Sequence, residues 1–328
     1  MISFRKIIYG LTICLPFLAS ANDCSTELIN WSDYSETIEL IKKSYHNGEF
    51  QLVEQTLSCL SESKNTFTSG KPGSIAVYWF FRNEMHAPGA DEEDKSRIDK
   101  WKRAVPGSKF ADFAELRFSY SQSWNARGSK YANKTKEVQL KHFKQKLLET
   151  EALILSEQNG LKETPISYNL LMAVALDTDG TQSSAMDVFN YGVTHWPNYY
   201  DFYEVLLTRL VPKWGGSWES VDGFINYWAA NLQQTEENTI YARFYHNVHI
   251  NNRVDPRTTL ADWSKLKPSL VNLYEKHPAR EYLAIAASYG CIYGDRDFYN
   301  KVVIENNIVT SEDWISGTSR EVCDSYYN

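Results

Sequence analysis

The stretch SDYSETIELIKKSYHNGEFQLVEQTLSCL, residues 32–60, decides the fold class. In its first half, Ile38, Ile41 and Tyr45 fall on one face of a helix that ends at Gly48. The second half repeats this pattern, with apolar side chains at steps of three and four residues. Two amphipathic helices joined by a tight glycine turn are the unit of a helical solenoid, because each pair exposes an apolar face that only a neighbouring pair can cover.

Helical spacing of apolar residues continues along the rest of the chain. Further helices are expected at residues 75–85, 98–105, 110–124, 134–160, 166–176, 183–196, 199–210, 218–232, 238–249, 260–277 and, as a last pair, 279–307. The chain has only 16 glycines and 10 prolines, too few for a protein of strands and turns. The predicted fold class is therefore all-α, an α-solenoid of tetratricopeptide-like helix pairs.

The N-terminus has the layout of a secretory signal peptide. Arg5 and Lys6 precede an apolar run over residues 7–18, and a small-x-small cleavage site ends at Ala21. The apolar run is too short to cross a bilayer as a helix. We therefore expect cleavage after Ala21 and a secreted or periplasmic protein. An uncleaved N-terminal anchor is the alternative.

The charge of the chain is acidic, with 41 acidic against 34 basic residues and a net charge of −7. The sequence contains no basic stripe, which argues against nucleic acid and against anionic membrane surfaces as partners. No apolar run after the predicted cleavage site is long enough to cross a bilayer, so we expect no transmembrane segment in the mature chain. The composition favours no particular oligomeric state.

Four of the five cysteines follow the predicted cleavage site. An even number in an oxidising compartment predicts two disulfides. Three pairings are possible, and the positions in sequence favour Cys24–Cys59 and Cys291–Cys323, each closing a loop that stabilises by about 3–4 kcal/mol. Buried free thiols are the alternative. No Cys-x-x-Cys occurs, so the sequence supports neither a thioredoxin-like redox site nor a cysteine zinc site.

Two segments differ from generic amphipathic helix: WNARGSKYA at residues 124–132 and LVPKWGGS at residues 210–217. Together they resemble the bacterial family labelled domain of unknown function 4034, over roughly residues 95–235. The resemblance implies a tetratricopeptide-like fold and supplies no activity. The expected organisation is a signal peptide over 1–21, N-terminal helix pairs over 22–90, a family-like helical core over 91–235, and C-terminal helix pairs with a cysteine-bearing tail over 236–328.

These two segments suggest a recognition surface. Trp124 and Trp214 are large amphipathic planes, and Arg127 and Lys213 can clamp an anion or a carboxylate of a partner. The alternative interpretation makes both segments tight turns between helices, with tryptophan as core filler. In that interpretation the turn residues are Gly128, Ser129, Gly215, Gly216 and Ser217.

No catalytic or metal-binding signature is present in the sequence. His246 and His249 share one predicted helix but lack a third ligand and a carboxylate base, so we interpret them as a surface pair. Residues 177–180 resemble the start of a calcium loop but are too few, which indicates a helix-ending turn. The acidic residues 91–94 are expected in a loop or at a helix N-terminus. We therefore predict no metal site and no cofactor.

Three functions fit these features. The leading hypothesis is a non-enzymatic binding module that holds a peptide or protein partner in the groove of the solenoid, which predicts no convergent pair of buried carboxylates. The alternative is an enzyme on cell-envelope glycans, a helical glycosidase or lyase, which needs two carboxylates facing one cleft. Its support is the export signal together with 10 Trp and 21 Tyr that can stack on sugars. A purely structural envelope protein would show neither groove nor pocket.

Overall fold

The structure of the chain is a computed structural model. It describes residues 29–86, 89–128, 130, 134–156, 164–178, 183–232, 236, 238–306, 314–315 and 317–327. The predicted signal peptide, Cys24 and Ser129 lie outside these residues. Within them no helix is both long and apolar enough to cross a membrane.

The described residues are organised as fifteen α-helices, and they contain no strand beyond one isolated bridge between Thr66 and Pro72. The helices are α1 (Tyr34–Asn47), α2 (Phe50–Glu62), α3 (Gly73–Glu84), α4 (Glu92–Ala104), α5 (Lys109–Arg127), α6 (Glu137–Leu155), α7 (Pro165–Thr178), α8 (Ala185–His195), α9 (Asp201–Leu210), α10 (Trp218–Asn231), α12 (Ile240–Asn252), α13 (Trp263–Lys276), α14 (Arg280–Ile292), α15 (Arg296–Glu305) and α16 (Arg320–Tyr327).

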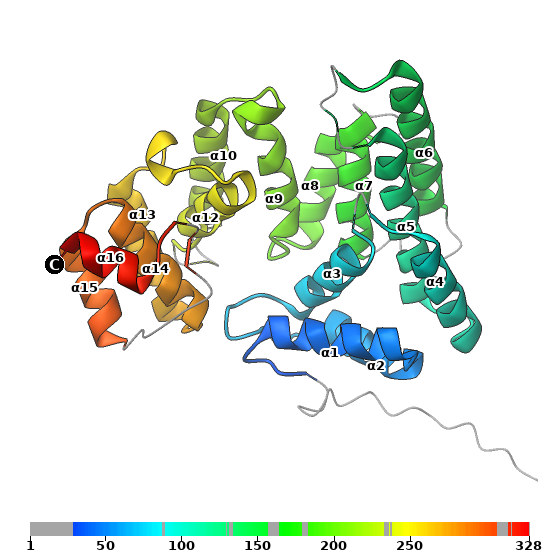
Figure 1. The fold of residues 1–328 in the computed structure, drawn as a ribbon, viewed down its shortest axis with the longest axis horizontal. Helices are drawn as coiled ribbons and strands as arrows, with labels where there is room; N and C mark the ends of the chain where they lie inside the picture. The colour runs from blue at the N-terminus through cyan, green and yellow to red at the C-terminus, as the bar shows by residue number, and fades with distance from the viewer. Residues whose placement is uncertain are drawn as a thin grey trace, which may run out of the picture.

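Most helices pack against their neighbours in the sequence, as the pairs α5–α6, α6–α7 and α14–α15 show, and some also pack against the next helix but one, as α1 does against α3. The result is a curved array of helices, with α1 and α2 below one side of the arch and α13 to α16 on the other (Figure 1). This arrangement confirms the predicted all-α helical solenoid. The array brings together parts of the chain that are far apart in sequence, because the loop between α2 and α3 lies against α14 (Figure 1).

Aromatic side chains hold the first four helices together. Tyr45 of α1 is fully buried, and its ring lies 5.5 Å from the rings of Phe80 and Trp101, in edge-to-face geometry. Trp101 of α4 also stacks on Phe50, the first residue of α2, at 6.0 Å. Such pairs add roughly 0.5–1.5 kcal/mol each beyond the area that they bury. The apolar face of the helix pair α1–α2, which was predicted from residues 32–60, is thus covered by α3 and α4, as a solenoid requires.

Local capping explains where the helices begin and end. Gly48 ends α1 in the left-handed conformation, with φ of 77°, which costs glycine least. Helix α4 begins at Glu92, well before the predicted start at residue 98. The reason is Asp91, whose side chain accepts hydrogen bonds from the first-turn amides of α4, while the Asp94 side chain accepts from the Asp91 amide.

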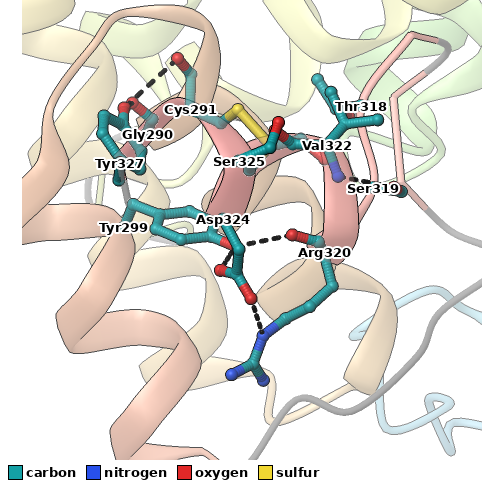
Figure 2. The surroundings of a disulfide bond; sticks show 12 residues. Gly290, Cys291, Tyr299, Thr318, Ser319, Arg320, Val322, Asp324, Ser325 and Tyr327 are labelled. Atoms are coloured by element: carbon teal, nitrogen blue, oxygen red, sulfur yellow. Dashed lines mark hydrogen bonds and ion pairs between the residues drawn. A yellow bond between two sulfur atoms is a disulfide. The ribbon is translucent and has the colours of Figure 1, made fainter.

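The short C-terminal helix α16 was not predicted from the sequence. A disulfide between Cys291 of α14 and Cys323 of α16 attaches it to the array, as the predicted pairing requires (Figure 2). Tyr299 of α15 also donates a 2.7 Å hydrogen bond to the Asp324 carboxylate. Near the other end of the chain, Cys59 is buried and is not a free thiol.

Candidate functional site

Trp124 of the first motif segment and Arg209, which directly precedes the second, meet at one buried carboxylate. Asp177 of α7 accepts hydrogen bonds from the Tyr120 hydroxyl at 2.8 Å and from Trp124 Nε1 at 3.1 Å. It also forms an ion pair with Arg209 of α9. We call these four residues the Asp177 cluster. The Asp177 side chain is only 2% exposed, and burial raises its pKa, although Arg209 and the two hydrogen-bond donors oppose that rise.

The sequence-predicted binding residues already have partners within the protein. Arg127 donates hydrogen bonds to the carbonyl oxygens of Gly128, at 3.2 Å, and Lys130, at 3.1 Å. Its guanidinium lies 5.1 Å from the ring centre of Trp124. The Trp214 ring is 47% exposed and lies under the Arg209 guanidinium, which links the second segment to the Asp177 cluster. The predicted binding role of these residues stays a prediction.

The glycines of both segments have conformational reasons to be glycine. Gly128 and Gly215 adopt φ of 77° and 91°, in the region that other residues avoid. A Cβ on Gly216 would lie 2.0 Å from the carbonyl oxygen of Leu210, so no larger residue fits there. Ser217 then caps α10 by accepting a 3.1 Å hydrogen bond from the Ser220 amide.

The interpretation of His246 and His249 as a surface pair was wrong. His249 is 2% exposed, and its ring nitrogens pair with the Tyr289 hydroxyl at 2.6 Å and with Thr259 Oγ1 at 3.2 Å. Burial lowers the pKa of His249 to about 3, so the ring is neutral. His246, one turn earlier, lines a cavity. Helical spacing alone could not show which face of this helix is covered.

The inner cavity is a space of about 380 Å³ between α3, α9, α12 and α14, whose positions Figure 1 shows. Its volume lies within the range of small-molecule and side-chain sites. Helix α9 contributes Asp201 and Glu204, and α12 contributes Arg243, His246 and Asn247. Aromatic and aliphatic side chains complete the walls, including Trp79, Ile250 and Trp314.

Polar contacts across the array hold the cavity walls in place. Arg243 donates to the Tyr282 hydroxyl at 2.7 Å and to the carbonyl oxygen of Ser69 at 3.1 Å, and Tyr282 donates to the same carbonyl. Lys71 forms a 3.4 Å ion pair with Glu281, which is 210 residues away in sequence. The loop between α2 and α3 is thereby joined to α12 and α14.

Two carboxylates of the cavity lack a counter-ion. Asp201 is 3% exposed, and its Oδ2 atom has no hydrogen-bond partner among the residues described. Burial raises the pKa of Asp201 well above its usual value, and the neighbouring Glu204 raises it further. Burial also raises the pKa of Glu204, while Lys71, Arg82, Arg243 and a hydrogen bond with Asn247 oppose that rise. No ion pair within the described ranges joins either carboxylate to a cation.

Unpartnered polar atoms gather at this cavity. Besides Asp201 Oδ2, the atoms His246 Nδ1, Asn247 Oδ1 and Trp314 Nε1 are buried without a hydrogen bond in the described structure. Burial, together with Lys71, lowers the pKa of His246 to about 4, so this histidine is neutral at ordinary pH. Buried polar groups are normally paired, and several such exceptions around one cavity indicate a place for a ligand.

Part of this site was visible in the sequence. Asp201 and Glu204 are three residues apart, which places them on one face of a predicted helix. Lys71, Arg243 and Glu281 come from three distant helices or loops, and nothing in their local spacing indicates that they meet. His246 was noticed, but it was interpreted as half of a surface pair. The described residues contain no group of three or more potential metal ligands.

Comparisons with known protein families, with curated proteins and with solved structures find no match. The resemblance to domain of unknown function 4034 therefore stays an expectation based on two segments. Function has to be argued from the inner cavity itself.

Proposed function

We propose that this protein is an exported, non-enzymatic binding module that holds a segment of a peptide or protein partner in its inner cavity. The observation that supports this most is the set of buried, unpartnered polar atoms around a cavity of about 380 Å³. A bound segment would supply the missing hydrogen bonds and remove the cost of leaving those atoms unpaired, which is about 1–3 kcal/mol for each group.

The mixed lining of the cavity suits a peptide segment. Aromatic and aliphatic walls can pack against a side chain, while Asp201, Asn247 and Trp314 offer acceptors and a donor. The helices α3, α9, α12 and α14 that line the cavity belong to one curved array (Figure 1), and solenoid proteins commonly hold extended partners on the concave surface of such an array. Because the walls are joined by hydrogen bonds and one ion pair, the site is largely formed before binding.

A peptide selection tests this proposal. Random peptides displayed on phage would be selected against the immobilised full chain, and their affinity then measured for two variants. Ile250, 44% exposed at the cavity, is replaced in Ile250→Trp, which narrows the space. The matched control is Ile304→Trp on α15, because Ile304 is 72% exposed and does not line the cavity.

The proposal expects Ile250→Trp to weaken the selected peptides at least about tenfold, a change of 1.4 kcal/mol. Ile304→Trp should leave their affinity unchanged. Equal affinity for the parent and Ile250→Trp would show that the peptides bind elsewhere and would overturn the proposal.

One observation favours the alternative, an enzyme on cell-envelope glycans: Asp201, Glu204 and Glu281 all line the inner cavity. Their arrangement argues against it. Asp201 and Glu204 are neighbours on one helix, so they share a wall and do not flank a bond from two sides. Glu281 is paired with Lys71. Release of reducing ends from peptidoglycan fragments, lost in Glu281→Gln, would favour the enzyme over the binding module.

A further inference from the structure

The chemistry of the ligand follows from the two carboxylates that lack a counter-ion. The cations nearest to Asp201 and Glu204 are already engaged with other groups. Lys71 pairs with Glu281, and its ammonium lies 4.0 Å from the ring centre of Tyr34. Arg82 stacks over the Trp79 ring at 4.5 Å.

Arg243 is held by the protein through its two terminal nitrogens. One donates a hydrogen bond to Tyr282 and the other to the carbonyl oxygen of Ser69, whereas Nε is buried without a partner among the described residues. Its guanidinium lies 5.3 Å from the ring centre of Tyr200. The described cations of the cavity thus stabilise its walls, and none forms an ion pair with Asp201.

An unpaired carboxylate in a buried position is costly, because burial removes it from water and nothing replaces the lost solvation. A cationic ligand would supply both the charge and the N–H donors that Asp201 Oδ2 lacks. Asn247 Oδ1, also unpartnered, is a second acceptor for such donors. The apolar lining by Ile250, Leu273 and Ile285 can receive an aliphatic stem.

We propose that the inner cavity recognises an organic cation on an aliphatic stem, the end of a lysine or arginine side chain, through Asp201 and Glu204. This inference rests on the proposed function, because it names the part of a peptide partner that the cavity holds. An anionic ligand would meet two carboxylates without a counter-ion.

Small probes can test the charge requirement directly. Isothermal titration calorimetry of the full chain would compare the Nα-acetyl N-methylamides of lysine, arginine and norleucine. Norleucine has the stem of lysine without the ammonium. The inference expects the lysine or the arginine probe to bind at least about tenfold more tightly than norleucine, and the better of the two identifies the natural side chain. Norleucine binding as tightly as both would overturn it.

Variants assign the effect to the two carboxylates. Asp201→Asn keeps the shape of the side chain and removes its charge, and Glu204→Gln does the same one turn later. Each should weaken the cationic probe at least about tenfold. The control is Glu219→Gln, a solvent-exposed carboxylate on α10 that does not line the cavity. Unchanged binding in both cavity variants, with circular dichroism showing native helix content, would overturn the assignment.

The failure of this inference can be told apart from failure of the proposed function. If Ile250→Trp abolishes binding of selected peptides that contain no lysine or arginine, the cavity is a peptide site and the cation assignment is wrong. If selected peptides bind Ile250→Trp as tightly as the parent, the cavity is not their site, and the proposed function is overturned as well.

Discussion

Asp177 and Asp201 are both buried aspartates of the same curved array, yet their surroundings are opposite. Asp177 is held by Tyr120, Trp124 and Arg209, which provide two hydrogen bonds and an ion pair. Asp201 has an oxygen with no partner among the described residues, and the neighbouring charge that affects its pKa most, Glu204, is another acid. The Asp177 carboxylate is thus satisfied by partners within the protein, whereas the Asp201 carboxylate is not.

The comparison points to a different site from the one that the sequence motifs suggested. Trp124, in the conspicuous first segment, belongs to a satisfied cluster that joins α5, α7 and α9. The inconspicuous Asp201 faces the cavity. A buried charge that a protein pairs internally stabilises the fold, whereas one left unpaired costs stability and indicates a site for a ligand.

The largest effect is expected from Asp177→Ala. It leaves Arg209, Tyr120 and Trp124 without their shared acceptor, and breaking such a buried pair should destabilise the fold by about 3 kcal/mol. Urea unfolding followed by circular dichroism measures this loss. Glu149→Ala, on the exposed side of α6, is the control and should cost less than about 0.5 kcal/mol. Equal stability of the two variants would show that the Asp177 cluster is not structural.

Asp201→Asn should change stability in the opposite direction. Because the Asp201 carboxylate is buried without a counter-ion, its replacement by a neutral amide of the same shape should stabilise the empty protein by about 1–3 kcal/mol. The same urea titration measures the gain. A loss of stability as large as that of Asp177→Ala would show that Asp201 has a structural partner.

The gain from Asp201→Asn should depend on pH. The folded-state pKa of Asp201 is raised, so its charge destabilises the fold above that pKa, and this cost disappears as the pH falls towards the unfolded value of about 3.8. The stability difference between parent and variant should therefore be largest near pH 8 and shrink in acid. A difference that stays constant from pH 8 to pH 4 would contradict the raised pKa.

Two neutral histidines also make the free energy of unfolding depend on pH between pH 8 and pH 4. They are present in both the parent and Asp201→Asn, so their contribution cancels when the two proteins are compared. The pKa of His246 is lowered to about 4 and that of His249 to about 3, so each contributes stability at neutral pH that is lost as the pH falls below about 6.5. Both proteins should therefore lose stability in acid. His249→Asn should reduce this acid sensitivity, as thermal unfolding at a series of pH values would show.

The smallest effects are expected at the exposed motif residues. Lys213 lies at the surface with its ammonium 5.8 Å from the Trp214 ring, so Lys213→Ala should change stability by less than about 0.5 kcal/mol. It should also leave the affinity of selected peptides within about twofold, since the residue does not line the inner cavity. A tenfold loss of peptide affinity would instead support the recognition surface that was predicted from the sequence.

The fold was largely predictable because its determinants are local. Apolar spacing around Ile38 and Ile41 located α1, and Gly48 marked its end. Helix α4 was predicted to start too late, because Asp91 was not recognised as a cap. Helix α16 was missed because it is a single short helix whose attachment depends on a disulfide to α14.

The inner cavity was not predictable in the same way. Lys71 and Glu281 form an ion pair across 210 residues, and only the curvature of the whole array brings them together. Burial is also a tertiary property. The sequence could place Asp201 on a helix, but it could not show that the covering helices leave one of its oxygens unpartnered. Residue spacing encodes single helices far better than it encodes the surfaces between distant ones.

The central claim is that a partner occupies the inner cavity and not the surface around the Asp177 cluster. Photo-crosslinking tests it most directly, using a selected peptide that carries a diazirine beside its basic residue, with the crosslinked positions mapped by mass spectrometry. The account predicts crosslinks to α9, α12 and α14, which are lost in Ile250→Trp. Crosslinks confined to Trp124, Arg127 and Trp214 would contradict it.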